Sequence, residues 1–265
     1  MTAQVDHVPP GTHAALPAKK RRRVRDLTVA DLVLTPAVLL SVLAALYLYL
    51  QGQELDEIEQ RSINWATISR LLVEHVQLVA VSSLLVIIIA VPMGVLLTRP
   101  ALRHATTPVL AVANLGQAVP SIGVLVLLAV TVGTGFRMAI IALVLVAFLS
   151  VLRNTIIGIT GVDRSLIEAA RGMGLTKTAV LFTVELPLSI PVMLAGIRVA
   201  LILNVGNAAL ASFTNAGGLG SLIQTGIALN RMPVLLTGCV LAAVLALALD
   251  WLAGIVERVL RPPGL

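Results

Sequence analysis

Long apolar runs, separated by short polar stretches, make up most of the chain. An α-helix needs about 20 mostly apolar residues to cross a bilayer. Six runs qualify or nearly qualify: 32–50, 76–97, 109–133, 136–153, 188–210 and 233–256. The pattern therefore predicts an all-α, polytopic membrane protein with about six transmembrane helices.

The third of these runs is interrupted by polar residues and a proline. Because proline lacks a backbone donor, we expect the helix over 109–133 to be broken or partly unwound near Pro120. A membrane tolerates such a break only where protein or water satisfies the freed backbone groups. A plain proline kink without a role in transport is the alternative. The candidates for a translocation path are polar residues at the depth of the spans: Asn114, Gln117, Pro120, Ser121 and Asn204.

Composition supports a membrane protein and excludes most other classes. Hydrophobic residues make up 58% of the 265 residues and charged residues only 12%, whereas soluble domains average about 45–50% apolar residues. The four histidines show no metal-ligand spacing and accompany no suitable serine or cysteine nucleophile, so neither a metal site nor an enzyme is expected. The single cysteine, Cys239, cannot form an internal disulfide.

Basic residues are distributed unevenly between the two sides of the membrane. Fourteen of the nineteen Lys and Arg residues fall on the side of the N-terminus and four on the other, while Arg198 lies inside a span. This positive-inside bias predicts a multi-pass plasma membrane protein whose termini and loop 163–187 are cytoplasmic. The basic run 19–25 directly precedes the first span, so we expect it to contact anionic lipid headgroups rather than nucleic acid.

Arg198 and Asp250 are charged residues within the fifth and sixth runs, in the cytoplasmic half of each. An unpaired charge inside the bilayer is costly. We therefore expect the two side chains to face the protein interior and to pair with each other. Alternatively, Arg198 extends toward the headgroups and Asp250 meets water at the helix end.

The chain divides by composition into four parts. A basic cytoplasmic tail (1–31) is followed by a first transmembrane helix with an acidic extracytoplasmic loop (32–75), a transmembrane domain (76–258) and a cytoplasmic tail (259–265). In the acidic loop, Trp65–His75 has the pattern of an amphipathic helix lying at the membrane interface. The loop is either a docking surface for an external partner or simply solvated.

A glycine-rich, semi-apolar stretch (215–227) follows the fifth run. Glycine permits close backbone approach and sharp turns, which favours a re-entrant segment or a tight extracytoplasmic gate. The stretch lacks the Lys and Ser/Thr pair of a phosphate-binding loop, and so does the rest of the chain. Any ATP that drives this protein must therefore bind to another polypeptide.

One charged stretch, Ser165–Pro187, stands between the apolar runs. Asp163 is an N-cap candidate for a helix, and Gly174 is placed to end that helix in the left-handed conformation. A second short helix is expected from Thr176 toward Pro187. Apolar residues at three- and four-residue steps predict a single apolar face on the first helix: Leu166, Ile167, Ala170 and Met173.

The spacing in this stretch resembles the EAA loop of ATP-binding-cassette (ABC) importer permeases of the type I fold. The matching pattern is Glu168-Ala169-Ala170, then Gly174, then Val184 and Leu186-Pro187. In that family the loop is cytoplasmic and forms a coupling helix in a groove of the ATP-hydrolysing subunit. An ordinary amphipathic connector is the alternative. The resemblance assigns coupling to the ATPase to seven residues: Glu168, Ala169, Ala170, Gly174, Leu175, Leu186 and Pro187.

Beyond the loop, the chain resembles the permeases of osmoprotectant importers for glycine betaine, carnitine, choline or proline. The further matching pieces are PMGVLLTRP (92–100), QAVPSIG (117–123), AGGLGSLIQTG (216–226) and ALDWLAGIVER (248–258). The resemblance implies two permease copies, identical or different, two ATPase subunits that bind ATP and Mg²⁺, and an extracytoplasmic substrate-binding protein. This chain is then a transport subunit without a cofactor of its own, working by alternating access.

Three other functions stay open at the level of sequence. The chain could be an ABC permease for another small solute such as methionine, phosphonate or an amino acid. A gradient-driven transporter or channel would have no use for the EAA spacing, and a membrane scaffold would need none of the transport features. Aromatic residues are only 3% of the chain, too few for a convincing quaternary-ammonium cage, so tight recognition of such a cargo is expected on a separate binding protein.

Overall fold

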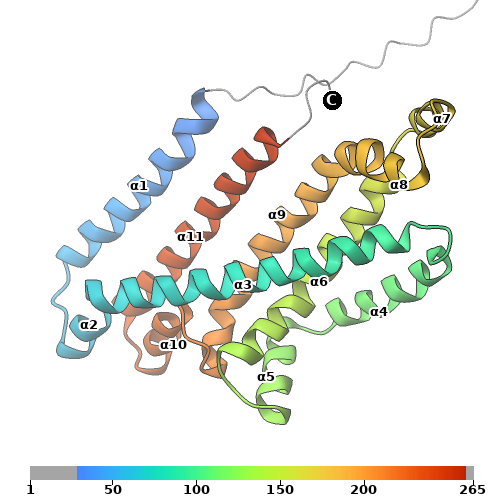
Figure 1. Ribbon diagram of the computed structural model, residues 1–265. Coiled ribbons are helices and arrows are strands. Elements are labelled where there is room, and N and C mark those ends of the chain that lie inside the picture. The colour runs from blue at the N-terminus through green and yellow to red at the C-terminus, as the bar shows by residue number, and fades with distance from the viewer. Residues whose placement is uncertain (1–28, 261–265) are drawn as a thin grey trace, which may run out of the picture.

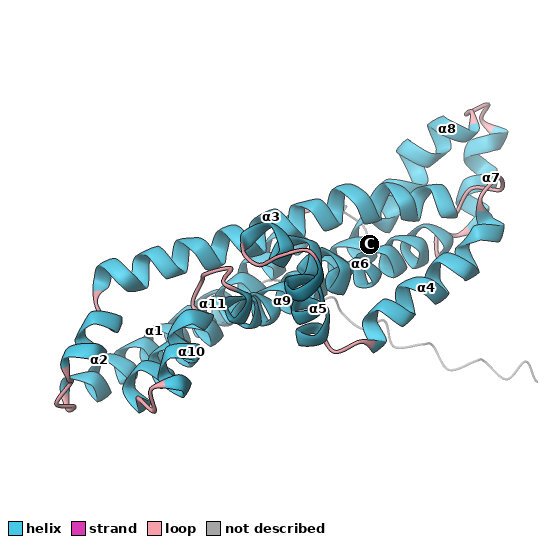
Figure 2. Ribbon diagram, turned by 90° about the horizontal axis from the view of Figure 1, so that it is seen from below, coloured by secondary structure: helices cyan, strands magenta, loops and turns pink. Residues whose placement is uncertain are grey.

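A computed structural model describes residues 29–260, and the regular structure within this part of the chain is entirely helical (Figure 2). The basic run 19–25 lies outside the described residues. Short 3-10 turns are found at Arg103–Ala105 and Ser212–Thr214, and a π-helical turn at Leu181–Glu185. The α-helices are α1 Val29–Gln51, α2 Glu57–Ser62, α3 Trp65–Leu97, α4 Thr106–Ala118, α5 Ser121–Thr131, α6 Phe136–Thr160, α7 Arg164–Gly172, α8 Lys177–Val180, α9 Leu186–Ala211, α10 Gly220–Ala228 and α11 Met232–Val259.

Within residues 29–260, five helical stretches are long and apolar enough to cross a membrane. A sixth candidate consists of the two helices Arg103–Ala118 and Ser121–Thr131, which are bent by 88° with respect to each other. The expected break near Pro120 is therefore confirmed. Val119 has extended backbone (φ −79°, ψ 128°), as expected for a residue before proline. The five unbroken stretches are Leu32–Gln51, Trp65–Leu97, Phe136–Thr160, Lys177–Thr214 and Met232–Val259.

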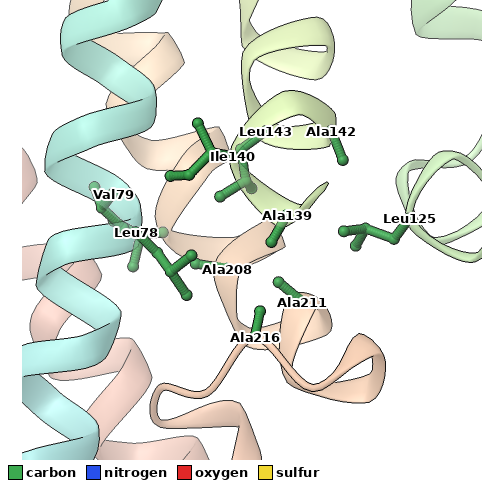
Figure 3. Packing of buried hydrophobic residues seen from close by; sticks show 11 residues of the cluster. Leu78, Val79, Leu125, Ala139, Ile140, Ala142, Leu143, Ala208, Ala211 and Ala216 are labelled. Atoms are coloured by element: carbon green, nitrogen blue, oxygen red, sulfur yellow. The ribbon is translucent and has the colours of Figure 1, made fainter. Parts of the chain in front are cut away.

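The core lies where α3, α6 and α9 meet, with α11 and α1 on one side and α4 on the other (Figure 1). Small residues let these helices approach closely. A Cβ added at Gly94 of α3 would lie 2.7 Å from the Thr155 side chain, and one at Gly196 of α9 would lie 2.4 Å from Asn154. Close contact of this kind holds helices together in a membrane. Figure 3 shows part of this core: Leu78, Val79, Ala139, Ile140, Leu143, Ala208, Ala211 and Ala216.

Helix α3 begins at Trp65 and runs for 33 residues without interruption, so the expected separate interfacial helix over Trp65–His75 is wrong. The reason is burial. His75 is fully buried and its Nε2 lies 3.1 Å from the carbonyl oxygen of Val205 in α9. These first turns of α3 also contribute to a small apolar cluster, here called the outer cluster: Leu71, Leu219, Leu222 and Val234.

The glycine-rich stretch folds into a tight turn followed by the short helix α10, which packs against α11 and α9. Gly217 and Gly218 both have positive φ, at 82° and 87°, which favours glycine. The Gly218 N–H donates a hydrogen bond of 3.0 Å to the Glu74 carboxylate of α3. The turn thus joins the end of α9 to the beginning of α3, in agreement with the sharp turn expected from the sequence.

Candidate functional site

The charged stretch between α6 and α9, residues 163–187, is here called the coupling segment. Helix α7 begins after Asp163, whose side chain accepts a 2.9 Å hydrogen bond from the Ser165 N–H. Hydrogen bonds from the Ser165 backbone and side chain lower the pKa of this carboxyl group. After α7, Gly174 has φ +89°, and the Oγ1 of Thr176 accepts a 3.2 Å hydrogen bond from the Ala179 N–H. The predicted helix start, glycine stop and second start are confirmed.

The apolar residues of α7 point in two directions rather than one. Ala170 is buried, and Ile167 lines a cavity between α7 and the neighbouring ends of α3 and α6. Leu166 and Met173 are instead 49% and 76% exposed. The predicted single face is therefore divided, because only one side of α7 rests on the bundle. An apolar surface is left on its outer side, next to the exposed Glu168.

The second half of the coupling segment is continuous with the membrane helix α9. Helix α8 passes into the π-helical turn Leu181–Glu185, and α9 follows at once, so the expected short helix ending near Pro187 is not separate. The Leu186 N–H donates to the Leu181 carbonyl, five residues earlier. Pro187 follows in the first turn of α9 and cannot donate a backbone hydrogen bond. π-turns are rare and frequently mark functional sites.

Three of the five path candidates line one cavity. Gln117, Pro120 and Ser121 border a space of about 420 Å³ between α4, α5, α6 and α9. Ser150 of α6 and Asn207 of α9 line it as well. Sequence reasoning missed these two, although each is a polar residue inside an apolar run. The lining holds amides and hydroxyls but no charged side chain.

The other two path candidates lie elsewhere. Asn204 is fully buried, and its amide donates hydrogen bonds of 3.0 Å to the hydroxyls of Ser82 and Ser83 on α3. It therefore joins α9 to α3 and does not border the cavity. Asn114 is exposed on α4 and is also absent from the cavity lining. A polar residue at span depth can thus serve packing as readily as transport.

Arg198 and Asp250 form the pair expected from the sequence. The Arg198 Nε lies 2.5 Å from Asp250 Oδ1, and Nη2 lies 2.8 Å from Oδ2. Such a two-point contact is the strongest geometry for this pair. Glu257 adds a carboxylate 3.6 Å from Arg198 Nη1. A Cβ at Gly254 would lie 3.4 Å from the guanidinium, so this glycine leaves room for the arginine between α9 and α11.

Known proteins with a related sequence or fold are membrane transport subunits. Residues 87–262 match the family described as the binding-protein-dependent transport system inner membrane component. The chain is 39% identical over 221 residues to the osmoprotectant import permease protein OsmY of Salmonella typhimurium, covering 83% of this chain and 92% of that protein. It is 38% identical over 192 residues to the glycine betaine/carnitine/choline transport system permease protein OpuCB of Bacillus subtilis, covering 72% and 88%.

The fold is similar to that of a solved transporter. In a crystal structure of the inward-facing MetNI methionine ABC transporter, one chain aligns with a TM-score of 0.64 and 28% identity, over 74% of this chain and 96% of that one. The helical architecture and the apolar spans described above agree with this likeness. The chain is therefore a member of the family of inner-membrane components of binding-protein-dependent transport systems.

Proposed function

We propose that this chain is the membrane-spanning permease subunit of an ATP-driven importer for a small compatible solute, of the glycine betaine, choline, carnitine or proline type. The relatives named above support this cargo class. The charge-free lining of the cavity around Gln117 and Asn207 also suits it, because neutral amides and hydroxyls hold a small zwitterion without trapping it. Tight recognition then belongs to a separate extracytoplasmic binding protein.

The observation that carries the proposal is the geometry of the coupling segment. Its first helix extends from one end of the bundle (Figure 1) and exposes Leu166 and Met173 on the side away from the core. Its second helix is continuous with α9, which lines the cavity. A partner ATPase that binds the outer face of α7 would therefore move a helix of the transport path. ATP and Mg²⁺ would be bound by that partner.

A second permease copy is the expected partner within the membrane. Several apolar side chains of the bent pair α4 and α5 are exposed: Val112, Leu115, Leu127 and Val130. Lipid covers such residues equally well, so they do not distinguish an identical from a different partner. Alternating access would follow if ATP-driven closure of two ATPases moved the two coupling segments together and opened the cavities in turn to each side.

We propose that both termini and the coupling segment face the cytoplasm, because of the positive-inside bias. In a Cys239→Ser background, Lys177→Cys should react with a membrane-impermeant maleimide only after the cells are opened. Arg61→Cys, in the exposed outer helix α2, is the matched control and should react in intact cells. Labelling of residue 177 in intact cells would contradict the orientation and, with it, the coupling role.

The cargo and the energy source can be tested together. Proteoliposomes that contain this chain, its ATPase and its binding protein should accumulate radiolabelled glycine betaine only when ATP is inside. Excess carnitine, choline or proline should reduce this uptake if they share the path, whereas methionine should not. Uptake that needs no ATP and stops when ion gradients are collapsed would indicate a secondary transporter. Competition by methionine would indicate the other cargo class.

A further inference from the structure

The coupling segment has a second connection to the bundle besides the peptide chain. Glu185 is the last residue of the π-helical turn, and only 9% of it is exposed. Its carboxylate accepts a hydrogen bond from the guanidinium of Arg99, which follows α3 by two residues. Arg99 is 86 residues away in sequence, so this ion pair ties the junction of α8 and α9 to the cytoplasmic end of α3.

The backbone at this junction is weaker than an ordinary helix. At the end of the π-turn, the Leu186 N–H donates to the Leu181 carbonyl, five residues back instead of the usual four. Pro187 and Pro191 follow, and neither can donate a backbone hydrogen bond. Helices bend at prolines and π-turns. A movement of the coupling segment would therefore bend the chain here, unless a contact with another helix prevents it.

The surroundings of the ion pair leave room for movement. A cavity of about 600 Å³ lies between the coupling segment and the ends of α3 and α6, and Thr98, Arg99 and Glu185 line it. Glu185 is the only acidic side chain in this lining, which also contains other cations: Arg164, Arg171 and Lys177. Among these cations, Arg99 is the one that forms an ion pair with Glu185. The Arg99 Nη2 also donates a hydrogen bond of 2.9 Å to the Thr98 hydroxyl.

We propose that the Arg99–Glu185 ion pair positions the junction of α8 and α9 against α3, so that a movement of the coupling segment displaces α3 together with α9. The inference rests on the proposed ATP-driven function and adds two positioning residues to it. Without the pair, the weak junction bends and α3 stays behind. With it, the displacement reaches the core, where Gly94 of α3 contacts Thr155 of α6.

A distance measurement tests this link directly and independently of the cargo. Spin labels at Leu96→Cys and Phe182→Cys, both exposed sites on either side of the pair, would be placed in a Cys239→Ser background of the assembled complex with its ATPase. When the Arg99–Glu185 ion pair is intact, the distance between the two labels should be the same with and without bound nucleotide. In Arg99→Gln it should change by several ångströms when nucleotide binds. An unchanged distance in Arg99→Gln would overturn the proposal.

Functional assays separate positioning from a merely structural role. Arg99→Gln and Glu185→Gln should each keep basal ATPase activity and co-purify with the ATPase, but lose most of the stimulation by the cargo-loaded binding protein. The double exchange Arg99→Glu with Glu185→Arg should restore it. If the single variants fail to assemble, the double variant Arg99→Glu with Glu185→Arg still tests the proposal. A double variant that assembles with the ATPase but whose ATPase activity is not stimulated by the loaded binding protein would overturn it. Arg61→Gln, which breaks an exposed pair with Glu57 at 3.7 Å, is the control and should behave as wild type.

Failure of the link and failure of the proposed function give different results. If the chain were not part of an ATP-driven importer, nucleotide would not move the coupling segment even in a complex that keeps Arg99. A third spin label, at Met173→Cys, would show this as an unchanged distance between residue 173 and the bundle. If the function holds and only the link is wrong, nucleotide would move residue 173 normally and Arg99→Gln would remain fully stimulated.

Discussion

Replacing Gly174 with valine is expected to reduce ATP-dependent uptake about tenfold or more while the protein still inserts and binds its ATPase. Gly174 has φ +89°, where a β-branched residue is strained by roughly 1–3 kcal/mol. Strain of about 1.4 kcal/mol lowers the population of this turn about tenfold, and uptake is expected to fall with that population. No heavy atom lies within 4 Å of a Cβ added there, so the effect comes from the turn that orients α7 and not from a steric clash.

The matched control for this substitution lies two residues earlier. Gly172 also has open space around an added Cβ but no positive φ, so Gly172→Ala should leave uptake unchanged. ATPase activity, co-purification of the ATPase and uptake in proteoliposomes should be measured together. Basal ATP hydrolysis should persist in Gly174→Val while uptake is lost. Normal uptake in that variant would show that the glycine turn does not orient the coupling segment.

The largest loss of stability is expected for Gly220→Ala, at the beginning of α10. A Cβ at this position would lie 1.9 Å from the carbonyl oxygen of Ala209 and 2.6 Å from the Ser212 hydroxyl. Overpacking of a well-packed site typically costs about 1–3 kcal/mol, and more where backbone must move. If the free energy of unfolding falls by about 3 kcal/mol, the midpoint of thermal unfolding should fall by roughly 6–12 °C.

Gly206→Ala is the control for this prediction, because a Cβ there meets no atom within 4 Å and the residue belongs to the same region of α9. Thermal unfolding in detergent, followed by the loss of the monodisperse peak in size-exclusion chromatography, would compare the two variants with wild type. Equal stability of the two alanine variants would mean that α10 does not pack against the end of α9 as described.

Features with a local cause were predictable from the sequence. Pro120 breaks its helix because of its own ring, and Asp163 and Gly174 begin and end α7 through bonds and angles within a few residues. The pairing of Arg198 with Asp250 was also predictable, since two lone charges in neighbouring spans have few other partners. The coupling role assigned to Gly174 and the path role assigned to Pro120 remain predictions.

Features that depend on distant partners were not predictable. Residues 65–75 have an amphipathic pattern that suggested an interfacial helix, but Glu74 accepts a hydrogen bond from the Gly218 N–H and His75 contacts the Val205 carbonyl. Those partners are more than a hundred residues away in the chain. Asn204 was misplaced for the same reason, since its partners Ser82 and Ser83 cannot be read from its own neighbourhood. The π-turn likewise has no local signature.

The length of α3 has a consequence for how the two ends of the protein are stabilised. Its 33 residues span about 50 Å, whereas the hydrocarbon layer is only about 30 Å thick. We expect the charged first turns, with Arg70 and Glu74, to lie outside this layer, together with the outer cluster around Leu71. That cluster joins the first turns of α3 to α10 and α11. Burial of apolar surface from water would stabilise this cluster, whereas helices in lipid are held by close packing, so urea should loosen the outer cluster while the lipid-embedded helices stay packed.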